Sequence, residues 1–234
     1  MSIPYFYIPS LNSSENTIQL DEETSKHISG VLRMKKGELL QLTDGKGHLA
    51  MAEIVDDHRK KCVVRIQAIS EQQSGIKKVT IAISLLKNSS RFEWFLEKAT
   101  EIGISEIIPL LCERTEKEKI RIARMQNILV SAMLQSQQRF LPILYEPDSF
   151  HSVISNATQN KKFIAHCIND EKKNLTDLLN ESMSSAIILI GPSGDFTHAE
   201  VQHAIQNHFV PVSLGRTRLR TETAGIVAAT LLSA

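Results

Sequence analysis

The residues best suited to chemistry gather in a loop near the end of the chain. Arg216, Arg218 and Arg220 fall within five consecutive positions, directly before an apolar stretch that predicts a helix. Guanidinium groups beside a helix N-terminus attract anions such as phosphate. A solvated basic turn that merely leads into the helix is the alternative. Leu219 lies between two of the arginines, and an apolar side chain there favours a packed, functional loop.

A second candidate site is the turn that follows the apolar segment Ile187–Ile190. It spans residues 191–195 and reads Gly-Pro-Ser-Gly-Asp. Its small residues would let a ligand approach the backbone N–H groups, and ligands of open α/β sheets bind beyond the carboxyl ends of strands. By itself, the turn is more typical of a plain connection between a strand and a helix. The sequence contains neither a GxGxxG nor a GxxxxGK[ST] pattern, which excludes dinucleotide and P-loop sites.

Both loops belong to a region of alternating strands and helices. A helix capped by Ser89 or Ser90 should end at Gly103, and the spacing of Thr197 and Glu200 predicts a capping box for a helix that ends near residue 207. The other expected elements are strands at 79–86, 107–112, 163–168, 186–190 and 209–214, and helices at about 118–139 and from 221 or 222 to 232. This region is therefore predicted to be α/β, with helices flanking a mostly parallel sheet.

The first 70 residues show a different pattern, namely short strands joined by tight turns. Segments 39–42 and 48–54 flank Asp44-Gly45, which is a strong turn signal, and segment 62–66 adds another strand. One helix is expected from Glu22 to Leu32. The polar stretch 71–75 predicts a boundary, so the expected domains are a small β-barrel at 1–72 and the α/β domain at 76–234.

The composition is that of a soluble globular protein, with 234 residues of which 42% are hydrophobic. No segment approaches the roughly 18 consecutive apolar residues of a membrane span, and the N-terminus lacks the features of a secretory signal. The three cysteines show no CxxC spacing, so we expect reduced thiols in the cytoplasm and no metal site. The net charge of +1 does not by itself indicate a nucleic-acid partner. Local clusters of basic residues can still attract phosphates, because charges act within the screening length of about 8–10 Å.

Several segments resemble signature sequences of the SPOUT methyltransferases. They are Leu189-Ile190-Gly191-Pro192, Leu214-Gly215 and Leu219-Arg220-Thr221-Glu222-Thr223-Ala224, of which the last is the most specific. The resemblance is greatest to the ribosomal RNA small subunit methyltransferase E family. It extends to Lys98–Ile104, to Ser131-Ala132 with Gln135-Ser136, and to His27 with Val31-Leu32-Arg33, so it spans the whole chain in the same order.

This resemblance implies a fold and an activity. The implied fold is a PUA-like barrel that helps to hold RNA, followed by an α/β SPOUT domain tied in a deep trefoil knot. The implied enzyme is a cytoplasmic homodimer without a metal, which binds S-adenosyl-L-methionine in the knot near the dimer interface. The implied reaction is methylation of N3 of the uridine conventionally numbered 1498 in 16S ribosomal RNA of the small subunit.

The chain departs from the family pattern at the turn 191–195. The family usually reads Gly-Pro-Glu-Gly-Gly, whereas Ser193 and Asp195 stand at the third and fifth positions here. This departure motivates one alternative, a non-catalytic RNA-binding module that has lost cofactor affinity, although Asp195 could replace the missing carboxylate in part. The other alternative is a SPOUT enzyme with a different RNA target.

Methyl transfer from a sulfonium is an in-line displacement, so positioning and electrostatics should dominate catalysis. We expect Arg220 to favour the uridine anion. Glu222 is the candidate base, with a helix cap or an arginine's partner as the alternative role. The expected cofactor-binding residues are His166, Leu189, Ile190, Gly191, Pro192, Gly194, Leu214, Gly215, Leu219, Thr223 and Ala224. The expected RNA contacts are Arg33, Lys35, Lys36, Lys87, Arg91, Arg216 and Arg218.

Two further residues with aromatic side chains, His166 and Trp94, each have more than one possible role. For His166, a buried structural position is the alternative to cofactor contact, and Cys167 ends the same predicted strand. Trp94 is expected to pack in the core or at a dimer interface rather than to stack on a base.

Overall fold

The computed structural model describes residues 3–11, 16–73, 77–116, 119–168, 170–179 and 183–234. The chain divides into two compact units, one formed by residues 1–74 with 133–141 and the other by residues 75–132 with 142–234. Part of the expected boundary, residues 74–76, lies outside the described residues. The return of segment 133–141 to the N-terminal unit was not expected from the sequence.

The N-terminal unit contains a five-stranded sheet in the order β1-β3-β4-β5-β2. The strands are β1 (Tyr5–Tyr7), β2 (Thr17–Gln19), β3 (Leu39–Thr43), β4 (His48–Asp56) and β5 (Val63–Glu71). β3 and β4 form the predicted antiparallel hairpin, and register shifts along β4 mark the irregularities that curl the sheet. Apolar side chains that alternate along β3 and β4 fill its core, among them Leu40, Leu42 and Ile54.

The expected helix at 22–32 has two parts. Helix α1 (Glu22–Lys26) is capped by Asp21, and residues His27–Val31 form a π-helix. The chain then leaves the helix through Arg33, whose φ of 56° lies in the left-handed region.

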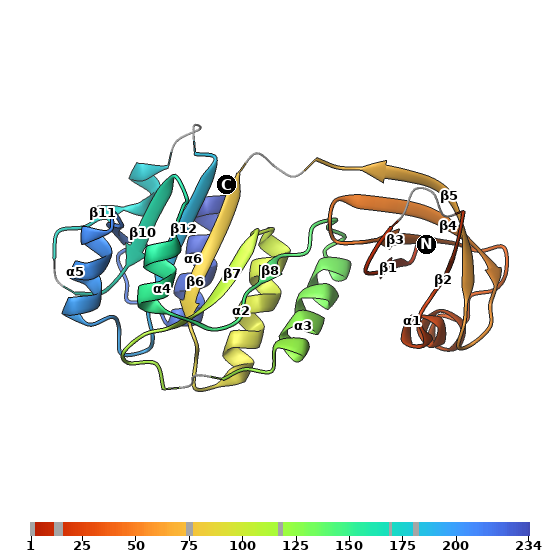
Figure 1. Cartoon of the computed structure of the whole chain (residues 1–234), viewed down its shortest axis with the longest axis horizontal. Coiled ribbons are helices and arrows are strands. Elements are labelled where there is room, and N and C mark those ends of the chain that lie inside the picture. The colour runs from red at the N-terminus through yellow and green to blue at the C-terminus, as the bar shows by residue number, and fades with distance from the viewer. Residues whose placement is uncertain (1–2, 12–15, 74–76, 117–118, 169, 180–182) are drawn as a thin grey trace. The chain divides into compact units, whose positions relative to one another are not determined.

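The second unit is built on a sheet whose registered strand pairs are all parallel (Figure 1). The strand order is β11-β13-β10-β12-β6-β7-β8, with β9 also paired to β7. Their bounds are β6 (Lys78–Ser84), β7 (Glu106–Leu111), β8 (Ile143–Leu144), β9 (Asp148–Ser149), β10 (Lys161–Ala165), β11 (Lys173–Asn174), β12 (Ser185–Ile190) and β13 (Val210–Ser213). The central strands β6 and β12 are buried almost throughout, as expected for strands covered on both faces.

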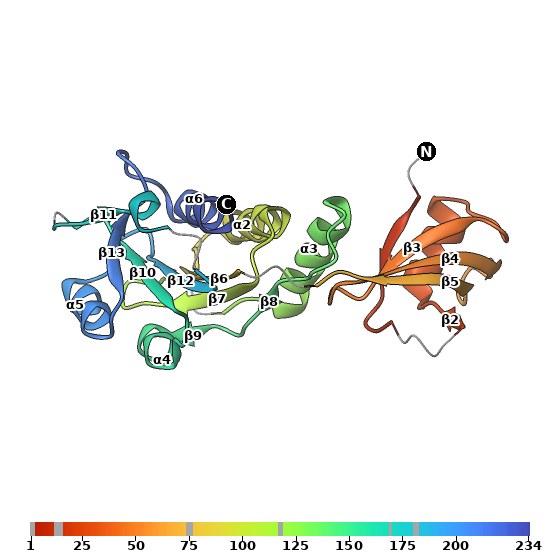
Figure 2. The ribbon, with the colours of Figure 1, turned by 90° about the horizontal axis from the view of Figure 1, so that it is seen from above.

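Helices cover both faces of this sheet. Figure 2 shows α2 (Ser89–Ile102) and α6 (Thr221–Ser233) on one face and α4 (Phe150–Asn156) and α5 (His198–Gln206) on the other. A short 3₁₀ helix, η2 (Leu175–Leu178), follows β11, and α3 (Ile122–Gln135) follows β7 along the chain.

Several expected element ends are confirmed and others are wrong. The capping box of Thr197 and Glu200 is present with both of its hydrogen bonds, and Gly103 ends α2 in the left-handed conformation. The cap of α2 is Asn88 rather than a serine, because the Asn88 side chain accepts a hydrogen bond from the Ser90 N–H. Helix α3 is shorter than the expected 118–139; the chain turns away beyond its end at Gln137, where φ is 55°.

Close packing of α6 against α2 and β6 depends on a glycine. A Cβ added to Gly225 would lie 2.7 Å from Phe95 Cε2 and 2.8 Å from Ile83 Cδ1. We therefore expect Gly225→Ala to destabilise the protein by about 1–3 kcal/mol, the usual range for an overpacked core. Denaturant unfolding measures this change. Gly30→Ala, where nothing lies within 4 Å of the added Cβ, is the control, and equal stability of both variants would contradict the expected clash.

Candidate functional site

The sheet brings the ends of three strands together. Ala165 at the end of β10 is registered with Ile190 at the end of β12 and with Val212 near the end of β13. Because all three strands run parallel, the segments that follow them meet at one edge of the sheet. These segments are residues 166–168, the turn 191–195 and the loop 214–220.

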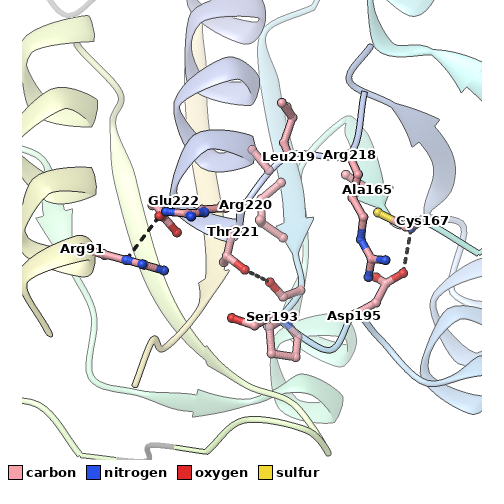
Figure 3. Close-up of a pocket in the computed structure, with 14 residues that line it drawn as sticks. Arg91, Ala165, Cys167, Ser193, Asp195, Arg218, Leu219, Arg220, Thr221 and Glu222 are labelled. Atoms are coloured by element: carbon pink, nitrogen blue, oxygen red, sulfur yellow. Dashed lines mark hydrogen bonds and ion pairs between the residues drawn. The ribbon is translucent and has the colours of Figure 1, made fainter. Parts of the chain in front are cut away.

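Around these segments the surface forms two hollows with a common wall. The first has a volume of about 430 Å³ and is lined by Arg91, Ala165, Cys167, Ile190, Gly191, Pro192, Ser193, Asp195, Arg218, Leu219, Arg220, Thr221, Glu222 and Ala224 (Figure 3). The second has a volume of about 310 Å³ and is lined by Ala165, His166, Cys167, Lys172, Val212, Ser213, Leu214, Gly215, Thr217, Arg218, Leu219 and Ala224. Cavities of about 300–1,000 Å³ are typical of small-molecule sites.

The start of α6 is joined to the turn after β12. Thr221 Oγ1 donates a hydrogen bond of 3.0 Å to the carbonyl oxygen of Gly191. Arg220 occupies the N-cap position with extended backbone, and its side chain makes no capping hydrogen bond. The first N–H groups of a helix have no partner within the helix, so this end of α6 offers positive charge density to the first hollow.

The first hollow carries three guanidinium groups and two carboxylates. Arg91 Nε lies 3.7 Å from Glu222 Oε1, and the Glu222 side chain is only 10% exposed. Arg218 and Arg220 are exposed and form no ion pair with the residues that the structure describes. Their guanidinium groups are therefore free to meet an anion from outside the chain.

Asp195 fixes the turn after β12 to the end of β10. Its Oδ2 accepts a hydrogen bond of 2.7 Å from the Cys167 N–H, and its Oδ1 accepts one of 2.9 Å from the Phe196 N–H. The φ of Asp195 is 64°, a conformation that favours glycine and that Asp tolerates better than most residues. Arg114 Nη1 also donates to the carbonyl oxygen of Gly194 at 2.7 Å. The departure from the family pattern thus leaves an ordered turn whose carboxylate bonds to a neighbouring strand end.

His166 is buried in the wall of the second hollow, with 7% of its surface exposed. Neither ring nitrogen has a hydrogen-bond partner among the described residues. Burial lowers the pKa of His166, and the nearby Lys172 ammonium lowers it further. The imidazole is therefore neutral at neutral pH.

Most of the expected cofactor-binding residues line one of the two hollows, although three do not. Leu189 is fully buried in the core of the sheet, whereas Gly194 and Thr223 lie beside the hollows without lining either. Sequence reasoning missed Ala165, Thr221, Lys172, Val212, Ser213 and Thr217. The strand register brings Ala165, Val212 and Ser213 to the site, and the types of these three residues carry no chemical signal in the sequence.

The expected RNA contacts fall in separate places. Arg91 and Arg218 line the first hollow, and Arg216 is exposed in the same loop without lining it. Lys87 pairs with Glu116 at 2.9 Å. The other expected contacts, Arg33, Lys35 and Lys36, belong to the N-terminal unit.

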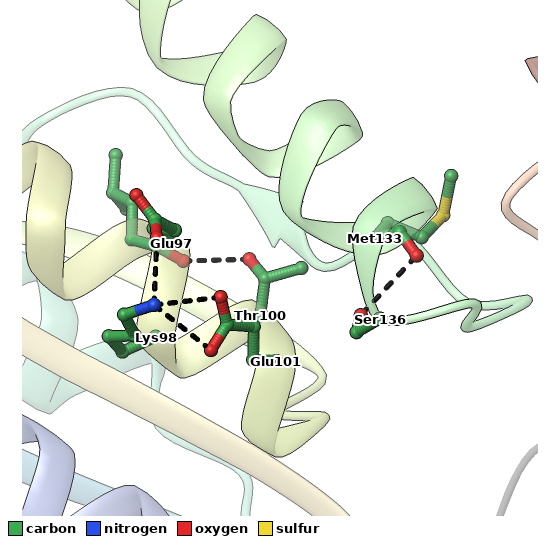
Figure 4. A network of polar contacts seen from close by, with 7 residues as sticks. Glu97, Lys98, Thr100, Glu101, Met133 and Ser136 are labelled. Atoms are coloured by element: carbon green, nitrogen blue, oxygen red, sulfur yellow. Dashed lines mark hydrogen bonds and ion pairs between the residues drawn. The ribbon is translucent and has the colours of Figure 1, made fainter.

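The upstream segment 98–104 has a structural role in α2. Lys98 Nζ contacts Glu97 at 2.8 Å and Glu101 at 2.9 Å, and Thr100 Oγ1 bonds to the carbonyl oxygen of Leu96 (Figure 4). None of these residues lines either hollow.

Trp94, on the same helix, is 44% exposed. Of the two positions expected for this residue, the core and a dimer interface, the core was therefore wrong.

Within the described ranges, no helix has the length and apolar character needed to cross a membrane. Over the same ranges, no three His, Cys, Asp or Glu side chains gather as metal ligands would.

Comparison with known proteins identifies the family. A family model described as an RNA methyltransferase domain matches residues 72–233, and one described as an RNA methyltransferase PUA domain matches residues 20–67. Ribosomal RNA small subunit methyltransferase E of Buchnera aphidicola (subspecies Acyrthosiphon pisum) is 30% identical, over 98% of this chain and 92% of that protein. The chain belongs to the ribosomal RNA small subunit methyltransferase E family.

Solved structures of this family share the fold over nearly the whole chain. A Porphyromonas gingivalis protein described as a probable rRNA-methyltransferase is 36% identical with a TM-score of 0.89, and the match covers 97% of this chain and 95% of that one. Ribosomal RNA small subunit methyltransferase E of Neisseria gonorrhoeae, bound to S-adenosyl methionine, is 28% identical with a TM-score of 0.87, at 97% and 95% coverage. The expected fold class, a PUA-like domain followed by a trefoil-knotted α/β SPOUT domain, is confirmed.

Proposed function

We propose that this protein transfers a methyl group from S-adenosyl-L-methionine to N3 of a uridine in 16S ribosomal RNA, at the position conventionally numbered 1498. The observation that carries the proposal is the meeting of the turn 191–195 with the start of α6 around one hollow, fixed by the bond from Thr221 to Gly191. Family membership supports ribosomal RNA of the small subunit as the substrate.

The hollows fit such a cofactor in three respects. Their combined lining offers apolar side chains, including Ile190, Leu214 and Leu219, between backbone segments. A Cβ at Gly191 would lie 3.0 Å from the Phe196 ring, so the chain here is packed as closely as a glycine permits. The free N–H groups at the start of α6 and the carboxylate of Asp195 supply polar partners. When bound, S-adenosyl-L-methionine supplies a sulfonium-activated methyl group.

Arg220 is assigned the main electrostatic role. The uridine N3 carries an imide proton, and its transfer to solvent water leaves negative charge on the base, which the incoming methyl group then neutralises. The exposed Arg220 guanidinium at the N-terminus of α6 would stabilise that charge, as preorganised cations and helix ends do in other enzymes. Arg216 and Arg218 in the same loop would hold the neighbouring phosphates.

Glu222 is assigned a positioning role rather than that of the base. Its buried carboxylate lies 3.7 Å from Arg91, which connects α2 to the start of α6 and holds Arg91 at the hollow. We expect Glu222→Gln and Arg91→Gln each to lower turnover by about tenfold, and the double variant to be no worse, because paired residues show coupling of about 0.5–3 kcal/mol. Single-turnover kinetics of the three variants measures this coupling. If Glu222 were the base, Glu222→Gln alone would remove a limb of the pH–rate profile.

RNA contacts outside the hollow are proposed for the N-terminal unit. Arg33 is exposed beside the π-helix and forms no ion pair with any described residue, whereas Lys35 lies 3.4 Å from Asp57. Lys35 and Lys36 follow Arg33 closely in an exposed stretch of the chain, so the three cations would reach a phosphate backbone together.

We also propose that the protein is a homodimer in solution, with α2 at the interface. Trp94 lies three residues after Arg91, on the same side of α2, and its large apolar surface is 44% exposed. Trp94→Glu is expected to shift the molar mass in light scattering from dimer to monomer. An unchanged mass for the variant, or a monomeric wild type, would refute this interface.

The target is tested with ribosomal RNA from a strain that lacks this gene. We expect reverse transcription through that RNA to lose the stop at the proposed uridine, and the purified protein with S-adenosyl-L-methionine to restore it on small ribosomal subunits. Mass spectrometry of the digested RNA would place the methyl group on N3. A stop that persists in the deletion strain would exclude the proposed target.

A further inference from the structure

We infer that Asp195 is a positioning residue for the methyl donor. Its carboxylate joins the turn after β12 to the end of β10, and this bond sets the affinity for S-adenosyl-L-methionine rather than the rate of methyl transfer. The inference rests on the proposed function. It assigns a role to a position at which the chain departs from the family pattern, where Asp195 stands in place of a glycine.

The bond that carries this inference joins two walls of the first hollow. Asp195 Oδ2 accepts a hydrogen bond of 2.7 Å from the Cys167 N–H (Figure 3), and both residues line that hollow. The two residues are 28 positions apart in the chain, so the contact is not part of a local turn. A hydrogen bond to a charged acceptor is stronger than one between neutral groups. The bond therefore fixes the separation of two segments that together enclose the space for a ligand.

The backbone of Asp195 is held in an uncommon conformation. Its φ is 64°, which most residues other than glycine avoid. Its N–H also closes the turn on the carbonyl oxygen of Pro192 at 2.9 Å, so the residue both completes the turn and reaches Cys167. Among the described residues, the others that combine a positive φ with a side chain are Arg33, Gln137 and His208. None of those three lines either hollow, and strain of this kind persists where the surrounding structure requires it.

The two ends of the turn after β12 are held by different contacts. At its first residue, the carbonyl oxygen of Gly191 accepts the hydrogen bond from Thr221 at the start of α6. At its other end, Arg114 Nη1 donates to the carbonyl oxygen of Gly194 at 2.7 Å, and Asp195 bonds to the end of β10. Removal of the Asp195 carboxylate leaves the first of these contacts in place. The start of α6, which carries the charge assigned to the chemical step, therefore keeps its position while the cofactor hollow loses a contact between its walls.

The test compares Asp195→Gly and Asp195→Asn with the wild type, by calorimetry with S-adenosylhomocysteine on the full-length protein and by methylation kinetics on undermethylated small subunits. We expect Asp195→Gly to bind S-adenosylhomocysteine about tenfold more weakly, the scale of one lost hydrogen bond to a charged group. The KM for S-adenosyl-L-methionine should rise by a similar factor, with the turnover number at saturation within about twofold of the wild type. Asp195→Asn keeps a carbonyl oxygen and tolerates a positive φ, so it should lose less affinity than Asp195→Gly.

The melting temperature separates positioning from folding. Glycine relieves the backbone strain at this position at the same time as it removes the carboxylate, so we expect Asp195→Gly to melt near the wild-type temperature. His208→Gly is the matched control, because His208 has a φ of 67°, is exposed and lines neither hollow. The His208→Gly variant should bind S-adenosylhomocysteine as the wild type does.

The outcomes separate this inference from the proposed function. Wild-type affinity and KM in Asp195→Gly, or equal losses in Asp195→Gly and Asp195→Asn, would overturn the inference alone. A variant that fails to fold would also overturn it, because Asp195 would then be a folding residue, and so would a fall in turnover number at an unchanged KM. If the wild type itself does not bind S-adenosylhomocysteine, the proposed function fails and the inference falls with it.

Discussion

Replacing Arg220 with alanine is expected to lower the turnover number by about 100- to 1,000-fold, the usual cost of removing one preorganised charge-stabilising group. The reason is that Arg220 lies exposed at the N-cap of α6, with no side-chain capping bond and no ion pair to any described residue. Its charge would act on the base as the N3 proton leaves. The measurement is single-turnover methylation of undermethylated small subunits, with both substrates saturating.

Arg216→Ala is the matched control for this prediction. Arg216 belongs to the same loop, carries the same charge and does not line either hollow. We expect Arg216→Ala to weaken RNA binding modestly and to leave turnover within a few-fold of the wild type. Wild-type turnover for Arg220→Ala at saturation would remove Arg220 from the mechanism.

Ala224→Leu is expected to weaken S-adenosyl-L-methionine binding by at least 100-fold, while the protein stays folded. Ala224 is the residue of α6 that lines both hollows, so a larger side chain there would occupy the space that the cofactor needs. Blocking a well-packed ligand position commonly costs several kcal/mol, and each 1.4 kcal/mol is a factor of ten in affinity. Calorimetry with the cofactor, alongside thermal unfolding, measures both properties.

Val227→Leu is the control for Ala224→Leu. Val227 lies one turn further along α6 and lines neither hollow. The Val227→Leu variant should bind the cofactor as the wild type does. If Ala224→Leu also bound the cofactor as tightly as the wild type, the cofactor would lie elsewhere.

The sequence predicted those features of the fold that depend on local patterns. The alternation of apolar strands and helices indicated the α/β unit, and the spacing of Thr197 and Glu200 placed the start of α5 correctly. The turn 191–195 and the loop 214–220 were both identified as candidate sites, because small residues after a strand and arginines before a helix are local signals.

Other features depend on contacts between distant segments, and the sequence could not predict them. The ion pair of Arg91 with Glu222 joins α2 to α6, and the bond from Cys167 to Asp195 joins two strand ends. The return of residues 133–141 to the N-terminal unit depends on packing such as that of Phe140 against Gly47. The burial of His166 without a partner follows from its place at the end of β10, which no pattern of residue types specifies.

The most direct test of the cofactor site is a crystal structure of the protein with S-adenosylhomocysteine. We predict that the ligand contacts the backbone of residues 190–191 and 214–215, lies against Ala224, and places its sulfur toward Arg220. A ligand bound away from the turn 191–195 and the start of α6 would contradict the proposed site.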